Sequence, residues 1–125
     1  MIAPDVYTTR PVEEELQRLE QYLTTQSDGL HVSIDSPVPI ERYVIPQSLV
    51  LIMQNAQRYH RLPLHVSIRF LKHTIEVSHP VQPLPTPDET HPDLQVLVDL
   101  YRIYYNFPTV RQTDNEFTVS IPLFI

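Results

Sequence analysis

The chain has 125 residues, 42% of them hydrophobic, which is enough for one hydrophobic core and too few for two ordinary domains. Its 9 basic and 15 acidic residues give a formal net charge of −6, so the basic excess that drives binding to nucleic-acid phosphates is missing. Because there is no cysteine and no apolar stretch near the roughly 18 residues of a membrane span, we expect one cytoplasmic domain over residues 1–125, without disulfides, nucleic-acid partner or membrane insertion.

The N-terminal half predicts two helices separated by a strand. Pro11 and three glutamates precede apolar residues at helical spacing, which predicts a helix over 12–27 that ends at Asp28–Gly29. The alternating pattern of LHVSID predicts a half-buried strand over 30–35. Pro46 then marks the start of a second helix over 46–60, whose broad apolar stripe indicates deep burial.

A hairpin and a proline-rich loop come next. Apolar residues alternate in LHVSIRF and again in TIEVS, which predicts two strands that turn near Leu71 to His73. Between Pro80 and Pro92 the chain has five prolines among threonines and acidic residues. Proline stops helices and removes ladder hydrogen bonds, so this stretch predicts a long, stiff surface loop.

The C-terminal part predicts a helix and a second hairpin. Helical spacing returns over 93–105, with Asp93 as the N-cap. A strand over 109–112, a turn at Asp114–Asn115 and an alternating strand over 117–123 follow. The mixture predicts an α/β protein, a two-layer sandwich whose mixed, largely antiparallel sheet is covered by about three helices.

Glycine and proline counts exclude several ways of binding phosphate. The chain has one glycine and 13 prolines, whereas ordinary chains have about 7% glycine and about 5% proline. Phosphate-cradling loops need several glycines, because their backbone approaches the anion closely and adopts positive φ. P-loops, Rossmann loops and kinase-type glycine loops are therefore excluded.

Two helices and the C-terminal hairpin resemble a known family. VEEELQRLEQYLTTQSDGLHVSID followed by YVIPQSLVLIMQNAQRYHR is similar to the C-terminal part of bacterial sensor histidine kinases of the LytS class. That class reads roughly L-x-x-E-L-x-x-[LI]-x-x-Y-L, then a strand, then a helix with E-N-A-[IF]-K-H. The closing RIYYNFPTVRQTDNEFTVSIPLF resembles members typical of the Bacteroides group. The resemblance implies the GHKL, or Bergerat, ATPase fold over residues 11–124, either free in the cytoplasm or as the cytoplasmic end of a membrane receptor.

The resemblance also implies where a nucleotide pocket would lie. Asn55 matches the family's magnesium-holding asparagine, and Arg58 keeps a cation for phosphate. The acidic residue that precedes this asparagine in the family is Gln54 here, and an amide cannot accept a proton. The residue that reads the adenine amino group, an aspartate or asparagine in the family, falls at His79. An acceptor for adenine is thus lost or weakened.

The glycine-rich lid of the family falls on HPDLQV at 91–96, where both glycines and the asparagine are gone. Asp93 would face the triphosphate there. One carboxylate ~4 Å from one phosphate charge costs on the order of 4 kcal/mol at an effective dielectric constant near 20. The family's upstream phosphoacceptor histidine also has no counterpart, because the first histidine is His31, inside the matched region. We expect no catalytic residues, no ATP and no magnesium.

Three functions follow from these residues. The first, which we expect, is a degenerate histidine-kinase-like domain that has lost ATP binding and acts in bacterial signal transduction through a protein partner or self-association. The second is an active sensor-kinase domain with divergent motifs that holds ATP and magnesium through Asn55 and Arg58. The third is a small-ligand or metal sensor that reuses the pocket. Its weak candidate metal ligands are His60, His79 and His91, which lack the tight spacing of a metal motif.

Overall fold

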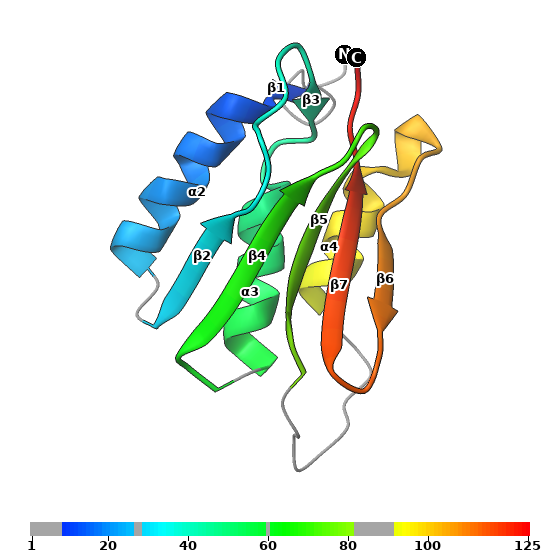
Figure 1. Ribbon diagram of the computed structural model, residues 1–125. Coiled ribbons are helices and arrows are strands. Elements are labelled where there is room, and N and C mark those ends of the chain that lie inside the picture. Colours follow the sequence, from blue (N-terminus) through cyan, green and yellow to red (C-terminus); the bar gives the residue numbers. More distant parts are fainter. Residues whose placement is uncertain (1–8, 27–28, 60, 82–91) are drawn as a thin grey trace.

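The structure is a computed structural model that describes residues 9–26, 29–59, 61–81 and 92–125. A sheet forms one layer, and the helices lie against one of its faces (Figure 1). The elements in chain order are β1 (Arg10–Pro11), α2 (Val12–Gln26), β2 (Leu30–Ile34), β3 (Tyr43–Val44), α3 (Ser48–Tyr59), β4 (Leu64–Phe70), β5 (Thr74–Pro80), α4 (Pro92–Leu100), the 3-10 turn η1 (Arg102–Tyr104), β6 (Thr109–Gln112) and β7 (Glu116–Pro122).

The main sheet has five strands in the order β2-β4-β5-β7-β6. β2 and β4 are parallel, whereas the β4–β5, β5–β7 and β6–β7 pairs are antiparallel. This arrangement confirms the predicted two-layer α/β sandwich with a mixed, largely antiparallel sheet. Both predicted hairpins form, with their turns at the expected residues.

The core lies between the sheet and the helices. Side chains alternate between the two faces of a strand, so every second residue of β4, β5 and β7 points toward the helices and is buried. α3 contributes the matching apolar stripe, and α3 also packs against α2 and α4. The most deeply buried apolar residues of these elements, each at most 1% exposed, are Val12, Leu49, Met53, Ala56, Val66, Ile68, Ile75, Val77, Leu97, Val119 and Ile121.

A second, two-stranded sheet joins distant parts of the chain at one end of the molecule. β1 pairs with β3 in antiparallel register. Tyr43 and Phe124 exchange two backbone hydrogen bonds of 2.8 Å, so the C-terminal segment is attached to the same place (Figure 1). The sequence did not predict this sheet, because its strands are too short to show a periodic pattern.

Helix boundaries differ from the sequence prediction in two helices, α3 and α4. α3 begins at Ser48 and not at Pro46, because Gln47 has φ 77, a left-handed conformation that cannot continue a right-handed helix. α4 begins at Pro92, so Asp93 lies inside the first turn and is not the N-cap. α4 also ends at Leu100, not at 105, because the chain tightens into the 3-10 turn and Tyr105 adopts φ 52.

The predicted proline loop is partly tested. Pro80 pairs with Glu116 as the last residue of β5, which shortens the loop. Proline is tolerated at a strand end, where its missing N–H removes little from the ladder. Residues 82–91, which hold most of the predicted loop, lie outside the described residues.

Gly29 connects α2 to β2 in a conformation that other residues rarely adopt. Its φ is 93, and a Cβ added there would lie 2.9 Å from the Cβ of Leu62. We expect Gly29→Ala to lower the free energy of unfolding by about 1–3 kcal/mol, because backbone strain and a steric clash coincide. Urea denaturation measures the change, with Gln21→Ala on the exposed face of α2 as control. An unchanged midpoint for Gly29→Ala would show that this connection relaxes freely.

Candidate functional site

The N-terminus of α3, the helix that carries Asn55, is held by a carboxylate from α2. Glu15 is 0% exposed. Its Oε1 accepts hydrogen bonds from Arg10 Nη1 at 3.0 Å and from the Gln47 N–H at 3.3 Å, and its Oε2 accepts one from the Leu49 N–H at 3.1 Å. A negative charge at this end also suits the helix dipole. Glu15 therefore fixes how α3 sits against α2.

A second buried polar contact ties α3 to the segment after α4. Tyr101 is 0% exposed, and its hydroxyl lies 2.7 Å from Ser48 Oγ. Because Ser48 Oγ donates to the Ile45 carbonyl at 2.7 Å, the tyrosine hydroxyl donates to the serine. Burial raises the pKa of Tyr101 well above its usual range, with the Ser48 hydrogen bond acting in the opposite direction. The phenol stays neutral, and its role in this pair is structural.

The nucleotide-pocket residues expected from the sequence are found in different surroundings. Asn55 is 1% exposed, and its Oδ1 is buried without a hydrogen-bond partner. Gln54, its neighbour on α3, is half-buried, and Arg58 is exposed in the last turn of the helix. The side chain of Asp93 lies outside the described residues, although its backbone belongs to the first turn of α4.

His79 lies on the helix-facing side of β5 and is 4% exposed. Its ring stacks on Phe117 of β7, with ring centroids 5.2 Å apart and an interplanar angle of 21°. Nδ1 is 3.0 Å from the carbonyl oxygen of Pro80, and a carbonyl accepts only, so Nδ1 carries the proton. The position of the expected adenine-reading acceptor is thus occupied by a packed imidazole that donates from Nδ1.

Magnesium and ATP, which the fold family implies, can be tested against these side chains. The orphaned Oδ1 of Asn55 is an oxygen donor of the kind that magnesium accepts. Magnesium sites also use one or two carboxylates and several waters, and the described residues contain no group of three or more His, Asp or Glu that could hold an ion. Gln54 is neutral, and Asn55 is closed off from solvent. Gln54 and Asn55 therefore supply no carboxylate at the position that the resemblance assigns to magnesium.

The weak metal candidates are not assembled in the part of the chain that the structure describes. His79 is buried against Phe117. His60 and His91 fall at positions outside that part.

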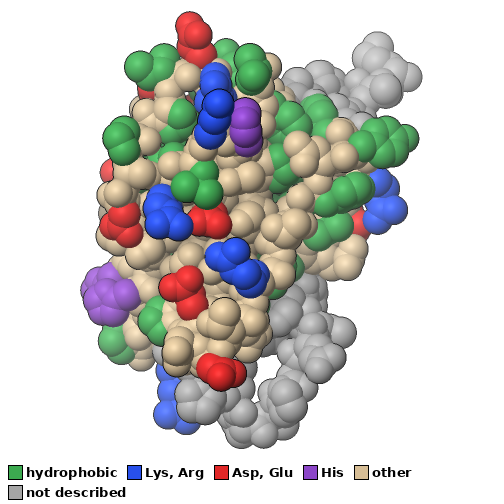
Figure 2. All heavy atoms as spheres, turned by 45° about the vertical axis from the view of Figure 1, so that its right-hand side comes forward, with side chains coloured by type: hydrophobic (Ala, Val, Ile, Leu, Met, Phe, Trp, Pro, Cys, Tyr) green, Lys and Arg blue, Asp and Glu red, His purple; other side chains and the backbone are tan. Residues whose placement is uncertain are grey.

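The opposite, open face of the sheet carries a polar hollow that sequence reasoning missed. Its volume is about 420 Å³, and its lining includes Asp35, Ser67, Arg69, Glu76, Ser78 and Glu116. Ser67 and Ser78 are direct partners on β4 and β5, so two small residues lie among longer charged ones. Arg69 Nη2 and Arg111 Nη2 lie 2.9 Å and 3.8 Å from the two carboxylate oxygens of Glu76. In Figure 2, acidic and basic side chains are interspersed over this side of the molecule.

Comparisons with known proteins place the fold. No protein-family profile and no curated protein matches the sequence. Among solved structures, Acinetobacter baumannii histidine kinase AdeS is similar at 20% identity and a TM-score of 0.53, over 89% of this chain and 62% of that one. The cytoplasmic segment of histidine kinase QseC is similar at 18% identity and a TM-score of 0.58, over 91% of this chain and 76% of that one. Mycobacterial sensor histidine kinase MprB is similar at 12% identity and a TM-score of 0.58, over 94% of this chain and 97% of that one.

The chain therefore has the fold of a histidine-kinase catalytic, or ATPase, domain. At these identities the likeness concerns the fold alone. The chain spans less than two thirds of the AdeS chain. Within the described residues, no helix is long and apolar enough to cross a membrane.

The orphaned oxygen of Asn55 leads to a stability prediction. A buried acceptor without a partner costs about 1–3 kcal/mol. Asn55→Leu removes that acceptor and keeps the same branched arrangement of side-chain heavy atoms, so we expect the free energy of unfolding to rise by about 1 kcal/mol where the core accommodates the larger methyl groups. Asn55→Asp, which adds a charge to the same volume, should lower it. Guanidinium denaturation measures both, and a clear loss of stability in Asn55→Leu would mean that the amide makes contacts the protein needs.

Proposed function

We propose that this chain is a degenerate histidine-kinase-like domain of the LytS class, which has lost ATP binding and acts through protein contacts in bacterial signal transduction. The observation that carries the proposal is the buried stack of His79 on Phe117. It stands at the position where the family places the carboxylate or amide that reads adenine. The function is therefore attributed to surfaces of the fold and not to a nucleotide reaction.

The chemistry of His79 argues against adenine recognition. Adenine presents an amino group, which needs an acceptor such as a carboxylate oxygen. The Nδ1 proton of His79 is already donated to the Pro80 carbonyl, and the ring is fixed by its contact with Phe117. Binding adenine at this position would require displacing a stacked, buried ring. The lost packing would oppose nucleotide affinity.

The lack of a carboxylate next to Asn55 supports the same proposal. Gln54 cannot activate a water or balance the charge of a metal ion. The sequence also replaces both lid glycines, so backbone N–H groups cannot approach the phosphates as they do in glycine-rich loops. The contacts to adenine, to the metal ion and to the phosphates are thus each weakened by a different substitution. A single compensating change would not restore nucleotide binding.

Action through protein contacts is supported by exposed apolar side chains at the end of the last helical segment. Tyr105 is 89% exposed, Phe107 is 42% exposed, and Val110 of β6 is 49% exposed. β6 is an edge strand whose residues are all exposed. Large aromatic residues in such positions are typical of protein-binding surfaces.

An active ATP-binding domain is the competing function, and the orphaned Asn55 Oδ1 is the observation in its favour. Thermal denaturation with and without millimolar magnesium-ATP or magnesium-ADP separates the two. A ligand at 100 times its Kd stabilises a protein by about 2.7 kcal/mol. We expect no shift for this chain, with the catalytic domain of an active histidine kinase as positive control. A nucleotide-dependent rise in Tm would reject the degenerate assignment.

A further inference from the structure

Two identical five-residue segments lie side by side in the sheet. β2 reads LHVSI at 30–34, and the first five residues of β4 read LHVSI at 64–68. The strands are parallel and paired without offset, so each residue lies beside its own copy. His31 is therefore the direct partner of His65. Neither pentapeptide alone indicates this, because the parallel register depends on the path of α3 between the two strands.

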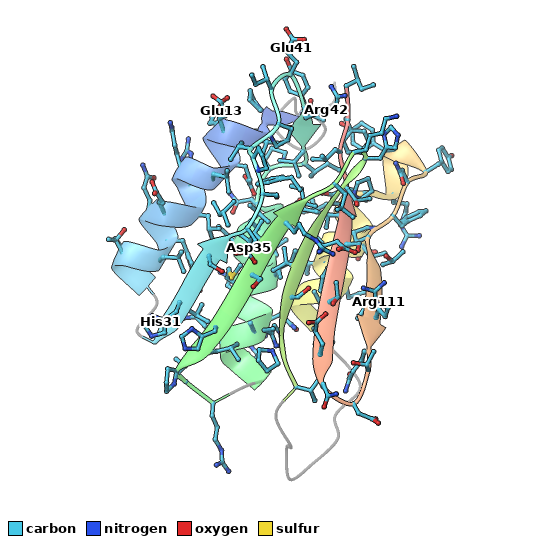
Figure 3. All side chains as sticks on the ribbon, in the orientation of Figure 1. Glu13, His31, Asp35, Glu41, Arg42 and Arg111 are labelled. Carbon is cyan, nitrogen blue, oxygen red and sulfur yellow. The ribbon has the colours of Figure 1, made fainter. Side chains whose placement is uncertain are left out.

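The two imidazoles lie on the open face of the sheet, away from the helices that cover Asn55. Both side chains are exposed. Their ring centroids are 5.0 Å apart, and the rings are stacked with an interplanar angle of 24°. Figure 3 shows His31 at the end of β2 where the strand begins, at the margin of the sheet. The pair thus stands apart from the former nucleotide pocket and is open to solvent.

The two rings lie close enough that one metal ion reaches both after they turn. Metal–nitrogen bonds to histidine are about 2.0–2.1 Å, which puts each ring centre about 3.2 Å from the ion. Two such rings at angles between about 90° and 110° have centres roughly 4.5–5.2 Å apart. The stacked rings, 5.0 Å apart, are already this close, so binding needs rotation of the side chains and little movement of the strands. The rings need to turn from the stack so that one nitrogen of each faces the ion, and as exposed side chains they have room to do so.

We propose that His31 and His65 form a binding site for a divalent transition-metal ion. Imidazole pairs suit copper, nickel and zinc, whereas magnesium requires oxygen ligands. Two protein ligands leave further coordination positions open. Either water or the same two histidines of a second copy of this chain fill these positions. The mass of the metal complex shows which, because only the second arrangement produces a dimer. The site belongs to the open face and does not depend on the loss or retention of ATP binding.

Calorimetric titration of the untagged protein with nickel chloride, copper chloride and magnesium chloride tests the site. We expect copper to bind more tightly than nickel, in line with the general order of divalent metals, and magnesium not to bind. His31→Ala or His65→Ala should each weaken nickel binding by about tenfold or more. His73→Ala, which removes an exposed histidine of the β4–β5 turn, should leave it unchanged.

NMR tests independently where on the protein the metal ion binds. Copper should broaden backbone amide signals around residues 30–32 and 64–66 before others, because a paramagnetic ion acts over short distances. Unchanged metal affinity in the His31→Ala, His65→Ala double variant, or broadening centred elsewhere, overturns the proposal. Equal Tm values of the variants without metal establish that they are folded. Light scattering with nickel then reports a monomer when water completes the site and a dimer when a second copy does.

Discussion

Glu15→Ala is expected to lower the free energy of unfolding by about 3 kcal/mol, because a fully buried carboxylate with three partners is lost. Its removal leaves the N–H groups of Gln47 and Leu49 without an acceptor at the start of α3. It also removes the 3.0 Å ion pair of Arg10, whose side chain is 18% exposed. Because Arg10 stays partly exposed to water, its charge remains partly solvated after the substitution. We therefore expect the loss of stability to lie at the lower end of the about 3–5 kcal/mol typical of broken buried ion pairs.

Urea denaturation monitored by far-UV circular dichroism measures this change. Glu13→Ala is the matched control, because Glu13 lies in the same first turn of α2 and is exposed. We expect that variant to stay within about 0.5 kcal/mol of the native chain. Equal effects of the two substitutions would mean that Glu15 contributes no more than helix-dipole stabilisation.

His79→Asp is expected to lower the free energy of unfolding by about 3 kcal/mol, since it exchanges a stacked ring for a buried carboxylate beside Phe117. Under the proposed function, this position corresponds to the aspartate or asparagine that faces the nucleotide pocket in active kinases. If the pocket has become part of the core in this chain, the carboxylate is left without compensation. Restoring the family residue should therefore destabilise the protein and not restore function.

Thermal and chemical denaturation of His79→Asp should be compared with His73→Asp. His73 is exposed in the β4–β5 turn, so its replacement should change stability by about 0.5 kcal/mol or less. Stability of His79→Asp equal to that of the control would indicate a hydrated pocket around residue 79, as in an ATP-binding domain.

Most strands and helices could be predicted from the sequence because their signals are local. The alternation of Leu64, Val66, Ile68 and Phe70 marks β4 directly, and all four residues are buried in the structure. α2 and α3 were likewise recognisable from apolar residues at helical spacing. The start of α3 was wrong by two residues, since the left-handed backbone of Gln47 leaves no pattern in composition.

The candidate site was less predictable because it depends on contacts between distant segments. The sequence placed Glu15 among three glutamates that suit a helix N-terminus, and nothing in that run distinguishes the one that reaches across to α3. The stack of His79 on Phe117 needs the register of β5 against β7. The resemblance to the LytS class predicts pocket positions at Asn55 and His79, and both side chains are buried in the structure.

Calorimetric titration of magnesium-ATP into the purified chain tests the loss of nucleotide binding most directly. We expect no saturable heat up to millimolar nucleotide, either for the native chain or for Asn55→Leu. Saturable one-to-one binding that Asn55→Leu abolishes would contradict it and would identify an active nucleotide site built around Asn55.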